Sequence, residues 1–153
     1  MARRRGSGQF DDRPQSAFTL ASDAATSLVR LALDSYRYRC AMTGEQFHPE
    51  PILPHPHLDV VPIQPLVLDG PQGIGNCLVL EENAAWAFRR GLIQVSEDFR
   101  IIVPAPDQLD ARLAPHVAPM QPLHLPEDPI LWPHPARLAF HRALFANGPG
   151  TTA

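Results

Sequence analysis

The chain has 153 residues, of which 44% are hydrophobic and 19% charged, and its formal net charge is −3. This length and composition indicate one soluble globular domain, because a chain of this size buries about two-thirds of its unfolded surface. No apolar run reaches the roughly 20 residues of a membrane span, and the negative charge disfavours non-specific binding to a phosphate backbone. The 18 prolines predict long irregular connections.

The two ends of the chain differ in composition from the middle. Residues 1–18 are polar and arginine-rich, which predicts a disordered tail, and residues 147–153 predict a flexible C-terminus. The segment between them, residues 19–146, is expected to form the single domain. The N-terminal MARRRGSGQFDD lacks the apolar segment of a signal peptide, so we expect a cytoplasmic protein.

The first half of the domain begins with a helix. From about Ser22 to Tyr36 apolar residues recur at helical spacing, and Ser22 or Asp23 is available as the N-cap. A short extended run over 39–42 is stopped by Thr43 and Gly44. A loop rich in proline and histidine then leads to a strand over 58–63.

The second half of the domain is predicted to contain a loop, a strand, a short helix, a β-hairpin and a closing helix. Residues 69–75 form a glycine-containing loop, and Asn76 opens a second apolar strand with the sequence CLVL. Residues 81–90 predict a short helix closed by Gly91. Alternating residues on both sides of Glu97-Asp98 predict a β-hairpin, and a proline-rich connection leads to a closing amphipathic helix. The apolar face of that helix is expected to include Leu138, Phe140 or His141, Leu144 and Phe145. The overall class is α+β.

The two cysteines limit the possible zinc and disulfide chemistry. Cys40 and Cys77 form no C-x-x-C pair, which excludes a four-cysteine zinc knuckle. In a cytoplasmic protein, two reduced thiols are expected instead of a disulfide.

Several short motifs of the sequence occur in the same order and at similar spacing in a known family. The runs YRYRCAMTG, LDVVPIQP, NCLVLEENAAWAFRRGLIQVSEDFRIIV and LPEDPILWPHPARLAFHRALF resemble the HNH endonucleases of the restriction-enzyme-like branch. The resemblance covers about residues 30–145. It implies a ββα-metal core, in which a two-stranded ribbon packs on a helix and holds one divalent cation, with flanking N- and C-terminal helices and a β-hairpin.

The family resemblance also implies where the chemistry would sit. In such nucleases a histidine at the end of the first strand activates water, an asparagine fixes the loop, and a helix histidine helps to hold the metal. The asparagine falls on Asn76. The general-base position falls on Pro62, the helix histidine on Ala85, and the acidic residue that follows the phenylalanine on Arg89.

Three of these four positions therefore lack the required chemistry. Proline and alanine neither accept a proton nor bind a metal, and the permanent charge of Arg89 would repel a cation. We therefore expect a pseudo-enzyme that needs no cofactor and serves as an accessory module for DNA or a protein partner. Asn76 is expected to bond loop backbone in place of its catalytic role.

Arginine positions supply the candidate contacts of this binding module. Arg3, Arg4 and Arg5 form a basic arm at the N-terminus, and Arg89 and Arg90 are adjacent at the end of a predicted helix. These five side chains are candidate contacts to phosphate or to a partner.

Two alternatives remain open at the level of sequence. The first is an active, divalent-metal-dependent nuclease whose displaced site uses His55, His57, Asp59 and Asn76. Prolines alternate with the histidines around 48–57, however, which favours an extended exposed loop without a specific metal site. The second alternative is a structural subunit of a larger assembly, in which the proline-rich segments 49–56 and 104–135 wrap a neighbour.

Overall fold

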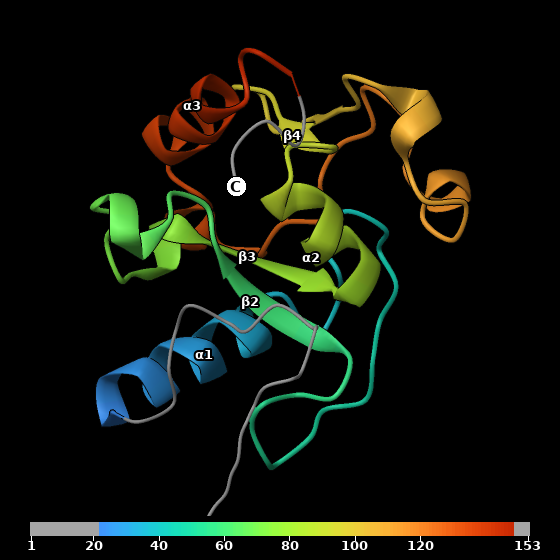
Figure 1. The fold of residues 1–153 in the computed structure, drawn as a ribbon. Helices are drawn as coiled ribbons and strands as arrows, with labels where there is room; N and C mark the ends of the chain where they lie inside the picture. The colour runs from blue at the N-terminus through green and yellow to red at the C-terminus, as the bar shows by residue number, and fades with distance from the viewer. Residues whose placement is uncertain (1–21, 149–153) are drawn as a thin grey trace, which may run out of the picture.

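The computed structural model describes residues 22–148 and shows a mixed arrangement of helices and short strands (Figure 1). The helices and strands, in chain order, are α1 (Asp23–Ser35), β2 (Leu58–Pro62), β3 (Cys77–Glu81), α2 (Glu82–Arg89), β4 (Gln94–Val95), β5 (Ile101–Ile102) and α3 (Pro135–Leu144). The α+β class is therefore confirmed. The predicted tail over 1–18, with Arg3, Arg4 and Arg5, lies outside the described residues, as do residues 149–153.

The first helix begins and ends where its apolar periodicity predicts. Ser22 is the N-cap, and its hydroxyl accepts a hydrogen bond from the backbone N–H of Ala25 at 3.1 Å. The apolar positions of α1 are buried, so the helix contributes one side of the core. The buried residues of α1 are Ala25, Leu28, Val29, Ala32 and Leu33.

The centre of the molecule is a two-stranded antiparallel ribbon. β2 and β3 pair from Leu58 opposite Glu81 to Pro62 opposite Cys77. Every residue of β3 is buried, because both α1 and α2 pack against the ribbon, and Figure 1 shows the ribbon passing between these two helices. The same elements that hold the core thus also position the end of β2.

The segment between α1 and the proline-rich loop differs from its predicted extended form. Arg39 makes an isolated antiparallel bridge to Gln46, but residues 41–43 form a turn. The turn is closed by a hydrogen bond from the N–H of Gly44 to the carbonyl of Cys40, at 2.9 Å. The prediction of a strand over 39–42 is wrong in its second half because this turn already begins at Cys40.

The helix α2 follows β3 directly and ends in a tight turn. The carboxylate of Glu81 caps its N-terminus by accepting from the N–H groups of Asn83 and Ala84. At the other end Gly91 adopts a φ of +73°, and a Cβ there would lie 2.3 Å from the ring of Phe145. A glycine is therefore needed for the reversal that leads into the hairpin β4–β5.

The closing helix resolves the alternative that the sequence leaves open. Leu138, His141 and Phe145 are buried, whereas Phe140 is only partly buried. His141 instead of Phe140 thus belongs to the core face of this segment. No helix within residues 22–148 is long and apolar enough to cross a bilayer.

Candidate functional site

Asn76 holds the loop that connects the two strands of the ribbon. Its Oδ1 accepts from the backbone N–H of Gln64 at 2.8 Å, and its Nδ2 donates to the carbonyls of Gln64 and Pro71, both at 2.9 Å. The side chain is 1% exposed. A single amide thus satisfies both backbone groups of one buried residue and a third group across the loop.

Gln64 extends this network to the closing helix. Its side-chain amide donates to the carbonyl of Leu68 at 2.7 Å, and its Oε1 accepts from the guanidinium of Arg137 at 2.5 Å. The loop is therefore fixed to α3 as well as to β3. Figure 1 shows this green loop next to α3.

The end of β2 and the adjacent face of α2 contain Pro62, Ala85 and Arg89, the positions to which the sequence resemblance assigns the general base, the helix histidine and the acidic residue. Pro62 is buried at the last pair of the ribbon, and Ala85 is 2% exposed on α2. Arg89 pairs with the carboxylate of Asp59 at 2.5 Å, with about a quarter of each side chain exposed. The one acidic group of β2 is thus already neutralised by a guanidinium.

A cavity of about 440 Å³ opens beside these residues and is almost entirely apolar. Its only titratable lining residues are Arg89 and His141, and Arg89 is held by Asp59. Val67, on the loop braced by Asn76, is 91% exposed at the cavity. The lining residues are Val61, Pro62, Ile63, Pro65, Leu66, Val67, Phe88, Arg89, His141, Leu144 and Phe145.

His141 lines this cavity but is committed to packing. Its ring stacks on Phe88 with a centroid distance of 3.8 Å, and its Nε2 bonds the carbonyl of Phe88 at 2.8 Å. Burial, together with the nearby charge of Arg142, lowers the pKa of His141 to about 4 although the hydrogen bond to Phe88 opposes the shift. The imidazole is therefore neutral at pH 7.

One histidine of the proline-rich loop, His55, differs from its predicted exposed state, whereas His48 and His57 are exposed as predicted. His55 is 6% exposed, and its ring lies against Tyr38 and Phe47. Its Nε2 bonds the carbonyl of His48, and its Nδ1 accepts from the N–H groups of His57 and Leu58. Both nitrogens of His55 are used to shape the loop, so the expectation of an exposed loop is wrong at this position.

The four residues of the displaced site are not brought together. His57 stacks on Phe47 with a centroid distance of 5.3 Å, and Asp59 is paired with Arg89. Asn76 bonds Ile63 at the opposite end of β2, about 13 Å from Asp59 at roughly 3.3 Å per strand residue. Within residues 22–148, no group of three or more His, Cys, Asp or Glu side chains could hold a metal ion.

The arginine candidates on α2 have intramolecular partners. Besides the pair of Arg89 with Asp59, Arg90 lies 4.0 Å above the ring of Trp86 and donates to the carbonyl of that residue at 3.3 Å. Trp86 is 41% exposed, so this stack lies on the surface. These contacts reduce the availability of both guanidinium groups for a ligand.

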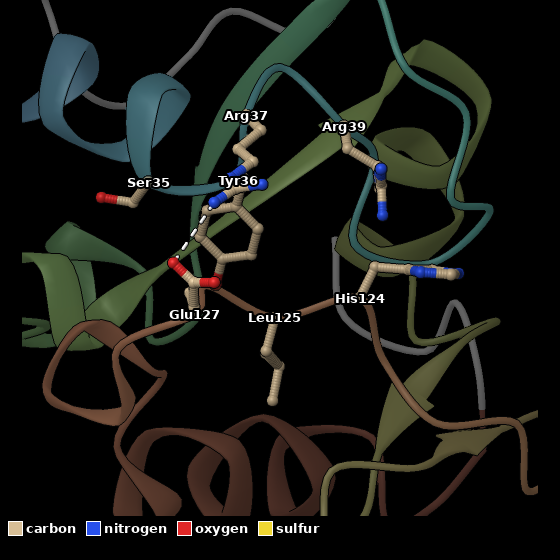
Figure 2. Close-up of a pocket in the computed structure, with 7 residues that line it drawn as sticks. All are labelled: Ser35, Tyr36, Arg37, Arg39, His124, Leu125 and Glu127. Carbon is tan, nitrogen blue, oxygen red and sulfur yellow. Dashed lines mark hydrogen bonds and ion pairs between the residues drawn. The ribbon is translucent and has the colours of Figure 1, made fainter.

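A second cavity, of about 310 Å³, was not predicted from the sequence. It is lined by Ser35, Tyr36, Arg37, Arg39, His124, Leu125 and Glu127 (Figure 2). The YRYRC run contains Arg37 and Arg39. Nothing in the sequence indicates that His124, which is 85 residues after Arg39, lines the same cavity.

Comparison with known proteins supports the fold. The sequence matches no protein-family model and no curated protein. Among solved structures, a chain described as a modification dependent TagI restriction endonuclease has a similar fold, with a TM-score of 0.58 and 19% sequence identity. The match covers 77% of this chain and 37% of the TagI chain, so the protein spans little more than a third of that neighbour. This chain therefore shares its fold with part of that structure.

Proposed function

We propose that the protein is a degenerate HNH-nuclease-like module that no longer hydrolyses DNA and acts as an accessory binding module, with a single domain over residues 19–146. The order β2, β3, α2 is the order that a ββα-metal core requires, and the hydrogen bonds of Asn76 to the loop backbone support the loop-bracing role proposed for it. The observation that carries the proposal is the ion pair of Arg89 with Asp59, because Arg89 lines the same cavity as buried Pro62. In the proposed correspondence Arg89 stands at the position of the family's acidic residue, so its permanent positive charge opposes binding of a divalent metal.

The chemistry of hydrolysis has no substitute at these positions. Loss of a general base costs about 10² to 10⁴ in rate, and Pro62 has no proton acceptor on its side chain. Loss of the metal also removes the group that stabilises the developing phosphate charge. A guanidinium held in an ion pair activates no water, so Arg89 does not restore cleavage.

We expect the purified protein to leave supercoiled plasmid DNA intact in magnesium, manganese, zinc and nickel. The reason is that the base and the metal-binding groups are both missing at the end of β2 and on α2. The measurement is a nicking assay, paired with calorimetry for each metal, on folded protein at high concentration.

Metal-dependent nicking would overturn the proposal. His57→Ala would then test whether the displaced site is responsible. Loss of nicking in this variant would support a metal site that includes His57. Asn76→Ala is unsuitable as an inactive control in the nicking assay. The Asn76 side chain holds three backbone groups, and its loss would alter the fold.

The apolar cavity favours a protein partner over DNA at the former catalytic face. A phosphate backbone requires exposed cations, whereas the guanidinium of Arg89 is paired and most of the lining is aliphatic or aromatic. Apolar pockets of this kind receive the anchor side chains of protein partners. We propose an extended peptide segment with one or two large apolar residues as the occupant.

We expect Val67→Asp to weaken binding of such peptides at least about tenfold, because a carboxylate at the cavity mouth must be desolvated. The measurement selects peptides from a displayed library on the full chain and compares their affinities by fluorescence polarisation. Val67 is 91% exposed, so the fold should tolerate the change.

Ile130→Asp is the matched control, since Ile130 is 80% exposed and lies outside the cavity lining. Equal affinity for the wild type and both variants would contradict the assignment. Peptides that bind while a DNA duplex does not would separate the protein-partner role from a DNA-binding role at this face.

A further inference from the structure

We infer that the cavity lined by Arg37, Arg39 and His124 is a binding site for a phosphate group, either free or carried by a nucleotide or nucleic acid. This cavity shares no lining residue with the apolar cavity beside Pro62. The inference therefore stands independently of the proposed function, and either can fail without the other.

Arg39 carries the strongest part of the argument. Its Nε is buried and has no hydrogen-bond partner, and no carboxylate within residues 22–148 forms an ion pair with its guanidinium. Buried N–H donors are normally paired, and an unpaired one is costly. Arg39 lines the cavity, and Figure 2 shows its guanidinium extending towards the side of His124. An oxyanion in the cavity would supply acceptors for the terminal nitrogens of this guanidinium, in the bidentate geometry that arginine prefers.

His124 lines the same cavity and is held in place by a glycine turn. Its backbone N–H donates to the carbonyl of Ala41 at 2.8 Å, and a Cβ on Gly44 would lie 2.5 Å from Nε2 of the imidazole. Gly44 also has a φ of +79°, so this position suits glycine on two counts. Burial and the neighbouring charge of Arg39 lower the pKa of His124. The neutral imidazole keeps one N–H that can donate to a ligand.

Arg37, at the rim of the cavity, has a guanidinium that can bind a ligand. Arg37 pairs with Glu127 at 3.2 Å, but their side chains are 67% and 86% exposed. Exposed pairs of this type are weak, so a phosphate oxygen can displace the carboxylate. Glu127 thus acts as an internal competitor. The cavity volume of about 310 Å³ is at the lower end for small-ligand sites and has room for a phosphate group.

The first test is calorimetry of inorganic phosphate with the full chain. We expect saturable binding that falls at least about tenfold in Arg39→Gln and rises severalfold in Glu127→Gln, because the first change removes the main donor and the second removes the competitor. Arg112→Gln is the control, since Arg112 is 76% exposed and pairs with Asp110 outside the cavity. Its affinity should equal that of the wild type. Should Arg39→Gln fail to fold by circular dichroism, Arg37→Gln replaces it and should also weaken binding.

The second test follows the imidazole itself. In a pH titration by nuclear magnetic resonance, phosphate should raise the pKa of His124, because a nearby anion stabilises the imidazolium. Absence of saturable binding at millimolar phosphate, or binding that Arg39→Gln and Arg37→Gln leave unchanged, would overturn the inference. An adventitious ion that does not move the His124 titration would overturn it as well.

The source of the phosphate is distinguished by two ligands. A nucleoside 5′-monophosphate tests a small-molecule source, and a short DNA duplex tests a nucleic-acid source. A duplex that binds more tightly than phosphate, with loss in Arg39→Gln and in high salt, would identify the nucleic-acid backbone. Binding of phosphate or the nucleotide without the duplex would identify a free small ligand.

Discussion

Asn76→Ala is expected to lower the free energy of unfolding by about 3 to 5 kcal/mol. The change leaves the N–H and carbonyl of Gln64 and the carbonyl of Pro71 without their partner. Each buried polar group left unpaired costs about 1 to 3 kcal/mol, and the three losses are not fully additive. The measurement is equilibrium unfolding in urea, with the slope compared between the variant and the wild type.

Asn83→Ala is the matched control for this change. Asn83 lies on α2, and its side chain makes no hydrogen bond within residues 22–148. Alanine is also the better helix former, so stability should stay the same or rise slightly. A loss in Asn76→Ala no larger than that in Asn83→Ala would contradict the bracing role. Faster hydrogen exchange at the Gln64 amide would locate the damage in the loop.

The sequence predicted the elements whose signals are local. Ser22 as N-cap, Gly91 as the end of α2 and the apolar runs of β2 and β3 all depend on residues within a few positions of one another. Thr43 and Gly44 marked the end of the extended run, but the start of the turn at Cys40 was missed because its closing hydrogen bond joins two backbone groups.

The candidate sites were less predictable, because they depend on contacts across the chain. The roles assigned to Pro62 and Asn76 rest on the family resemblance and stay a prediction, and the pairing of Arg89 with Asp59 joins residues 30 apart. Hydrophobic periodicity predicts which face of one helix or strand is buried. It does not predict which charged side chains of different elements form ion pairs. The burial of His55 and the meeting of Arg39 with His124 were missed for the same reason.

Protonation of His141 is expected to lower the free energy of unfolding by about 3 kcal/mol as the pH falls from 6.5 to about 4. The pKa of His141 is lowered from 6.5 to about 4 in the folded protein, first because the ring is buried. The unfolded chain therefore binds this proton more readily than the folded one between these values. By linkage the stabilisation is fully present above pH 6.5 and is lost at about 1.4 kcal/mol per pH unit below it.

The hydrogen bonds around the ring explain the direction of this effect. Nε2 donates to the carbonyl of Phe88, so the lone pair that would take the proton is on Nδ1. Nδ1 is buried and has no hydrogen-bond partner among the described residues. Protonation would thus place a charged donor in an apolar contact with Phe88 and Phe145, close to the guanidinium of Arg142.

The measurement is urea unfolding at several pH values from 4 to 8 for the wild type, His141→Gln and His116→Gln. Glutamine retains an amide donor for the Phe88 carbonyl but does not titrate, so His141→Gln should lose most of the slope between pH 6.5 and 4. His116 is exposed, and its replacement should keep the slope. Asp98, Asp110 and His124 have lowered pKa values that also cost stability in acid, but they are common to all three proteins. An unchanged slope in His141→Gln would therefore show that the buried imidazole is not the group that titrates.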